Sequence, residues 1–154
     1  MTETVKDLLM DVGKSVIGVS LAKAIDLPKK LDFGDNLVVR NVANGVMYYA
    51  IGDTINYISN DAPSNIATLN IIGGLDGIAY YSAVSAGAEL TKIDGMLYRF
   101  AGDVGLSRTN AELLSESAIV SAGRITARML DEMPNVPNWL KVIRHPSRAL
   151  NMVN

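Results

Sequence analysis

The segment that most constrains this chain runs from residue 66 to residue 88 and reads IATLNIIGGLDGIAYYSAVSAGA. It is the most apolar stretch of the sequence, and it is as long as a helix that crosses a bilayer, which needs about 20 residues. Small residues recur along it at four-residue spacing, and such a stripe lets two helix backbones approach closely. The sequence therefore predicts a helix-packing interface made by Gly73, Gly77, Ala79, Ala83 and Gly87.

Asp76 interrupts this segment and weakens the case for a bilayer crossing. A mid-span aspartate costs about 2.5–3.5 kcal/mol on insertion scales, whereas each Leu, Ile or Val returns only about 0.3–0.6 kcal/mol. The apolar residues roughly cancel the aspartate, so the segment is marginal as an isolated span. A buried acid needs a partner, and we expect Arg40 or Arg99 to supply it; a proton or ion site is the alternative.

Residues 37–58 form a second apolar segment, and the spacing of its large apolar residues predicts a helix. A strand over residues 37–43 is a local alternative. Arginine, asparagine and aspartate are embedded in this segment, so it could cross a bilayer only beside helices that satisfy those groups. For both 37–58 and 66–88 the alternative is an interior helix of a soluble bundle, where small residues also permit close packing.

Amphipathic helices are expected on either side of these segments. Residues 4–25 and residues 110–132 place apolar and charged side chains at helical spacing. Thr109 and Glu112 have the spacing of a capping box, which predicts where the second of these helices begins. Stretches that contain proline follow both helices and end them.

These elements predict an all-α protein with a single domain over residues 1–154. We expect a helical hairpin or bundle in which one or two apolar helices, transmembrane or interior, are flanked by amphipathic ones. Its parts are an amphipathic helix and connector at 1–36, an apolar helical core at 37–106, and an amphipathic helix with a basic tail at 107–154.

A short pattern, Asn/Asp-Gly-x-x-Tyr, occurs three times, beginning at Asn44, Asp76 and Asp94. The separations are unequal, so the pattern is not the period of a solenoid. It indicates either a duplicated helical hairpin or a coincidence in an apolar, glycine-rich chain.

The sequence offers no recognisable catalytic centre. The chain has no cysteine, which excludes disulfides, thiolate metal sites and cysteine nucleophiles. His145 is its single histidine, so a zinc site is not expected. No glycine-rich phosphate loop with its lysine occurs. We expect a non-enzymatic protein with no metal, no cofactor and no small-molecule substrate.

The C-terminal tail joins Trp139 to the basic residues Lys141, Arg144 and Arg148. This combination suits contact with an anionic membrane face or, more weakly, with nucleic acid. A simple solvated tail is the alternative. The whole chain has a net charge of −2, which gives no overall attraction to nucleic acid.

Apolar segments with embedded asparagines, a small-residue stripe and short amphipathic ends indicate a subunit that pairs with copies of itself or with other structural subunits. In this general character the chain resembles the small minor capsid and internal-membrane proteins of icosahedral DNA viruses that enclose a lipid layer. The resemblance implies a membrane-associated virion protein that links capsid and bilayer without catalysis. The alternatives are a soluble cytoplasmic all-α scaffold or binding subunit, and a small channel or ion-handling membrane subunit with Asp76 in its pathway.

Overall fold

The computed structural model describes residues 3–26, 35–60 and 62–153, and within them it contains helices and turns but no strand. The connector expected before residue 37 lies largely outside the described residues. The helices are α1 (Glu3–Ile25), α3 (Leu37–Ile58), α4 (Ile71–Thr91), α5 (Ile93–Asp103), α6 (Arg108–Glu132), α7 (Asn138–Arg144) and α8 (Ser147–Val153). The prediction of an all-α protein is confirmed, and residues 37–43 are helical rather than extended.

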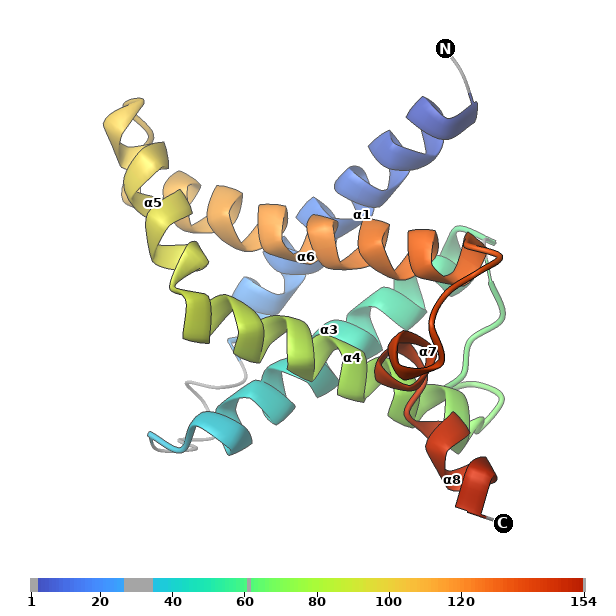
Figure 1. Ribbon diagram of the computed structural model, residues 1–154. Coiled ribbons are helices and arrows are strands. Elements are labelled where there is room, and N and C mark those ends of the chain that lie inside the picture. Colours follow the sequence, from blue (N-terminus) through green and yellow to red (C-terminus); the bar gives the residue numbers. More distant parts are fainter. Residues whose placement is uncertain (1–2, 27–34, 61, 154) are drawn as a thin grey trace.

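The helices pack as a bundle around two pairs (Figure 1). α3 and α4 form an antiparallel hairpin, and α6 crosses α1 on the other side of the molecule. α5 packs against α6 and projects from one corner, as do the N-terminal turns of α1. The short helices α7 and α8 lie against α4, and α7 also contacts α6, so the C-terminal tail is folded onto the bundle.

Asparagine and serine side chains cap the helices at different places from those the sequence suggested. α4 begins at residue 71 rather than 66, because residues 65–69 form turns and Leu69 has a positive φ of 54°. The Asn70 side chain then accepts from the N–H of Gly73. The expected capping box of Thr109 is also wrong, since Ser107 caps α6 by accepting from the N–H of Asn110.

The interior of the bundle is as polar as it is apolar. Large aliphatic side chains contribute little to it, and serine, asparagine and aspartate are buried between the helices. The buried apolar residues are Val19, Ala22, Met47, Tyr80, Ala101, Ala111, Val120 and Val136; the buried polar ones are Ser15, Asn41, Asp53, Ser64, Asp76, Ser115, Ser117 and Ser121. Polar groups must therefore find partners inside the fold, because an unpaired buried polar group is costly.

Large apolar side chains instead lie on the outside of the helices. The buried residues of α1 are Ser15, Gly18, Val19 and Ala22, whereas most of its other aliphatic side chains are exposed. The exposed apolar residues of the three helices α1, α3 and α4 are Val5, Leu9, Met10, Val12, Val16, Ile17, Leu21, Ile25, Val38, Val39, Val42, Val46, Tyr57, Ile58, Ile71, Ile72, Leu75 and Leu90. This distribution is the reverse of the usual one for large apolar residues.

Among the described residues, none of the helices combines the length and the apolar character that a membrane crossing requires. The sequence left two alternatives for residues 37–58 and 66–88, a membrane-spanning helix or an interior helix of a bundle. No spanning helix is found in the part of the chain that the structure describes.

Candidate functional site

The hairpin of α3 and α4 is held together where glycine lets the two backbones meet. A methyl group on Gly45 would lie 2.8 Å from the carbonyl oxygen of Ile78 and 2.8 Å from the backbone nitrogen of Ser82. A methyl group on Gly77 would collide with the ring of Tyr49. Two copies of the Asn/Asp-Gly-x-x-Tyr pattern therefore face each other across the hairpin.

The predicted stripe of small residues on α4 is divided between two environments. Gly73 lies against the side chain of Asn65, and Gly77 lies against Tyr49. Ala79 is half-buried and Ala83 is exposed, while a methyl group on Gly87 would meet nothing within 4 Å. Only the first half of the stripe packs within the described chain.

Asp76, the buried acid of the apolar segment, holds the C-terminal tail against α4. Its Oδ1 accepts from the backbone N–H of Ser147 at 2.8 Å, and its Oδ2 accepts from the Ser147 hydroxyl at 2.7 Å. Nδ1 of His145 lies 3.4 Å from the same Oδ2. The side chain that interrupts the apolar segment is thus a docking point for α8.

The expected pairing of Asp76 with Arg40 or Arg99 is wrong. Arg40 forms an ion pair with Glu89 on α4. Arg99 is exposed and donates from Nε to the carbonyl oxygen of Gly95 in its own helix. The sequence identified Asp76 as a buried acid in need of a partner, but the partner comes from the tail, more than 70 residues further along the chain.

A cluster of alternating charges extends from this docking point. Asp131 on α6 accepts from Nη2 of Arg144 at 2.9 Å, and Nε2 of His145 lies 2.9 Å from its other oxygen. The Arg144 guanidinium lies over the ring of Tyr80, 4.9 Å from the centroid. The Tyr80 hydroxyl donates to the carbonyl oxygen of Gly123 at 2.8 Å. α4, α6 and α7 are joined through these contacts.

A second buried network joins α1, α3 and α6. The guanidinium of Arg124, whose side chain is 10% exposed, donates to Oδ1 of Asn56 at 2.9 Å. Nη1 of Arg128 lies 2.8 Å from Oδ2 of Asp11. Lys14 also donates to Asn56, at 3.2 Å, and burial followed by the charge of Arg124 lowers the pKa of its ammonium group. Charged side chains of α1 and α6 and the Asn56 amide of α3 therefore meet inside the bundle.

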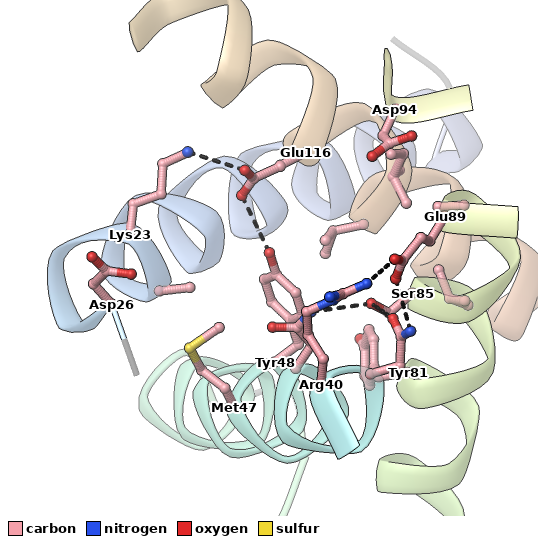
Figure 2. A pocket seen from close by; sticks show the side chains of 17 residues that line it. Lys23, Asp26, Arg40, Met47, Tyr48, Tyr81, Ser85, Glu89, Asp94 and Glu116 are labelled. Carbon is pink, nitrogen blue, oxygen red and sulfur yellow. Dashed lines mark hydrogen bonds and ion pairs between the residues drawn. The ribbon is translucent and has the colours of Figure 1, made fainter. Parts of the chain in front are cut away.

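A cavity of about 420 Å³ opens between α1, α3, α4 and α6 (Figure 2). Its walls carry both charged and apolar side chains, and Figure 2 shows the bases directed toward acids on neighbouring helices. Nζ of Lys23 lies 3.0 Å from Oε1 of Glu116, and Arg40 pairs with Glu89. The lining residues include Lys23, Asp26, Arg40, Asn41, Asn44, Met47, Tyr48, Tyr81, Ser85, Glu89, Asp94 and Glu116.

Carboxylates beside this cavity change the pKa values of Lys23 and Tyr48. The hydroxyl of Tyr48 donates to Oε2 of Glu116 at 3.4 Å, and burial, together with that carboxylate, raises the pKa of Tyr48. Burial alone would lower the pKa of Lys23, but hydrogen bonds and the charges of Glu116 and Glu112 raise it. Nδ2 of Asn41 donates to Glu89 at 2.9 Å. Among the lining residues, acids and bases thus serve as helix-joining pairs.

No group of three or more histidine, cysteine, aspartate or glutamate side chains in the described chain could hold a metal ion. On the wall of the cavity, the Tyr48 hydroxyl donates to Glu116, whose carboxylate also pairs with Lys23, and the Ser85 hydroxyl donates to Oδ1 of Asn41.

Asp53 is a structural carboxylate that the sequence analysis did not single out. Its oxygens accept from the hydroxyl of Ser64 at 2.6 Å and from the N–H groups of Asn65 and Ile66 at 3.0 and 3.3 Å. Burial would raise the pKa of Asp53, but these three hydrogen bonds lower it below its ordinary value. The sequence does contain a pattern that could have predicted this contact, namely an acid within an apolar helix followed by a Pro-Ser-Asn turn.

The basic tail is only partly free. Trp139 is 64% exposed, and Arg148 is exposed as well. Arg144, by contrast, is engaged by Asp131 and Tyr80. Lys141 is half-buried beside the end of α6, where it lines a small hollow with Arg144 and Arg148.

Comparison of this chain with protein-family models, with curated proteins and with solved structures finds no match.

Proposed function

We propose that this chain is a non-enzymatic structural subunit that assembles with copies of itself or with other subunits at a membrane. The observation that supports this proposal is the reversed distribution of its residues. Polar and small side chains make up most of the buried residues of α1, α3, α4 and α6, whereas most of the large apolar side chains of α1, α3 and α4 are exposed or only half-buried. Exposed apolar surface on this scale is typical of interaction sites.

The outer face of α3 shows how much burial of the exposed apolar side chains could stabilise an assembly. Val39, Val42 and Val46 lie on one side of the helix and are 42%, 44% and 41% exposed. Full burial of a valine or leucine side chain stabilises a complex by about 1.5–3 kcal/mol relative to full exposure. Covering these partly exposed valines would contribute roughly half of that per residue. The equivalent surfaces of α1 and α4 would add to it.

The alternatives draw less support from the geometry. A soluble scaffold would use the same apolar faces, but with protein partners alone. An ion-handling role would need Asp76 to face a path, whereas both of its oxygens accept hydrogen bonds from Ser147. The resemblance to minor capsid and internal-membrane proteins would make the assembly a virion that encloses lipid.

The proposal is tested by sedimentation and by flotation of the full chain with phosphatidylcholine vesicles. We expect the wild type to sediment as an assembly and to float with the vesicles. Threonine at Val39, Val42 and Val46 keeps the shape of the side chains but removes an apolar methyl from each, and it should reduce both properties. Threonine at Val104, which lies outside this face, is the matched control. A wild type that is monomeric, cooperatively folded and absent from the floated fraction would overturn the proposal.

A further inference from the structure

The tail and the end of α6 enclose a hollow of about 210 Å³ whose walls are predominantly basic. Lys141, Arg144, His145 and Arg148 line it, together with a single carboxylate, that of Asp131. Leucine, methionine and valine side chains complete the lining. This hollow differs from the cavity between α1, α3, α4 and α6, where acids outnumber bases.

The positive charges around the hollow are only partly neutralised. Asp131 is occupied by Nη2 of Arg144 and by Nε2 of His145, each at 2.9 Å. Within the described part of the chain, neither Lys141 nor Arg148 has an ion-pair partner. Nε of Arg144 is buried and has no hydrogen-bond acceptor. Lys141 and Arg148 thus line the hollow as cations without an ion-pair partner in the described chain, and Arg144 lines it beside them.

These groups fit a ligand with several acceptor oxygens and a negative charge. A phosphate group meets that description, because it accepts from more than one donor at once and is bound well by arginine and lysine together. A carboxylate offers fewer oxygens, and Asp131 already supplies one beside the hollow.

The exposed apolar residues of the tail indicate which kind of molecule carries the phosphate. Trp139, Ile143 and Leu150 belong to the same tail and are 64%, 52% and 66% exposed. Tryptophan favours the interface between headgroups and acyl chains, and aliphatic side chains favour the acyl region. Nucleic acid would use the cations and the indole ring but would leave the aliphatic side chains in water.

We propose that this hollow binds the phosphate of an anionic lipid headgroup, with Lys141, Arg144 and Arg148 as its ligands and Trp139 inserted beside it. The inference rests on the proposed membrane-associated function and names the lipid chemistry that the tail recognises. Asp76 has a supporting part, because its hydrogen bonds to Ser147 hold α8, and with it Arg148, at the edge of the hollow.

The test compares binding of the full chain to vesicles of pure phosphatidylcholine and to vesicles that also contain phosphatidylglycerol. Each basic residue near an anionic surface contributes about five-fold in binding. The double variant Lys141→Ala and Arg148→Ala should therefore lose about thirty-fold of the preference for the anionic vesicles. Lys6→Ala with Arg99→Ala removes the same charge from exposed positions on other helices and should change that preference far less.

The readouts separate the competing explanations. Fluorescence of Trp139, the single tryptophan, should shift to the blue on anionic vesicles and not with inorganic phosphate or glycerol phosphate. If both double variants lose the same preference for anionic vesicles, the attraction is spread over the whole surface and the hollow is not the binding site. An equal response to free phosphate, or charge-dependent binding of duplex DNA without vesicle binding, would overturn the lipid source.

Sedimentation and flotation on neutral vesicles test the proposed structural function separately from the lipid site. Sedimentation as an assembly, together with flotation on neutral vesicles but no headgroup preference, refutes the hollow and leaves the structural role in place. A wild type that neither assembles nor floats on any vesicle refutes both.

Discussion

Replacing Gly45 with alanine tests the packing of the α3–α4 hairpin at its closest point. The added methyl would lie 2.8 Å from the Ile78 carbonyl oxygen and 2.8 Å from the Ser82 nitrogen, and it would also meet the Ser82 hydroxyl. Because two of these atoms belong to the backbone, a change of side-chain rotamer cannot relieve the clash. The helices must move apart at their crossing.

The magnitude follows from two opposing effects. Overpacking in a well-packed interior costs about 1–3 kcal/mol, and contact with backbone atoms places Gly45→Ala near the upper end. Alanine recovers about 1 kcal/mol relative to glycine in the interior of a helix. We therefore expect a net loss of about 2 kcal/mol in the free energy of unfolding. In urea this corresponds to a fall of roughly 1 M in the midpoint.

Gly87→Ala provides the matched control. It also lies within a helix, but a methyl group there meets nothing within 4 Å, so the variant should gain about 1 kcal/mol from helix propensity alone. Urea unfolding followed by far-UV circular dichroism, at one protein concentration and in one solvent, compares the two variants. If both variants shift the midpoint of urea unfolding by the same amount in the same direction, α3 and α4 do not cross as closely as described at Gly45.

Two further predictions concern buried carboxylates. Because hydrogen bonds lower the pKa of Asp53, its contribution is complete above the unfolded value of about 3.9 and is lost as the pH falls through the lower folded value. Asp53→Asn should lower the free energy of unfolding in urea by about 1.5–3 kcal/mol at neutral pH. The difference between the variant and the wild type should become smaller in acid, and a difference that does not change with pH would contradict this prediction. Asp11→Ala removes the carboxylate that pairs with Arg124 and Arg128, leaves Arg128 only the more distant Glu132 at 4.0 Å, and should cost about 1.5–3 kcal/mol in the free energy of unfolding. Asp7→Ala, exposed on the same helix, should stay within about 0.5 kcal/mol. Equal effects of the two alanine variants in thermal unfolding would exclude the buried network.

The helices themselves were largely predictable, because their periodic apolar residues and proline stops act over one or two turns of chain. Residues 37–58 were predicted as a helix with the bounds that α3 has. The start of α4 was misplaced, since the turn over residues 65–69 depends on hydrogen bonds from Ser64, Asn65 and Ile66 to Asp53 in the preceding helix. A local pattern does not contain that contact.

For the candidate site, too, the sequence identified the local features but not the contacts between distant residues. The sequence marked Asp76 as a buried acid and the tail as basic, because each is a property of a few adjacent residues. It could not join them, because the bonds from Ser147 to Asp76 depend on the tail folding back over α4. Likewise, nothing local distinguishes Gly45, which is packed against a backbone, from Gly87, which is not.

The sequence alone determined that this chain is all-α, that it lacks cysteine chemistry, and that its most apolar segment combines small residues with the acid Asp76. Local spacing and composition are sufficient for those conclusions. Only the tertiary structure decided which side chains lie inside. Helical periodicity shows that one face is apolar but not which face the neighbours cover, and here the neighbours cover the polar and small residues and leave much of the apolar surface outside.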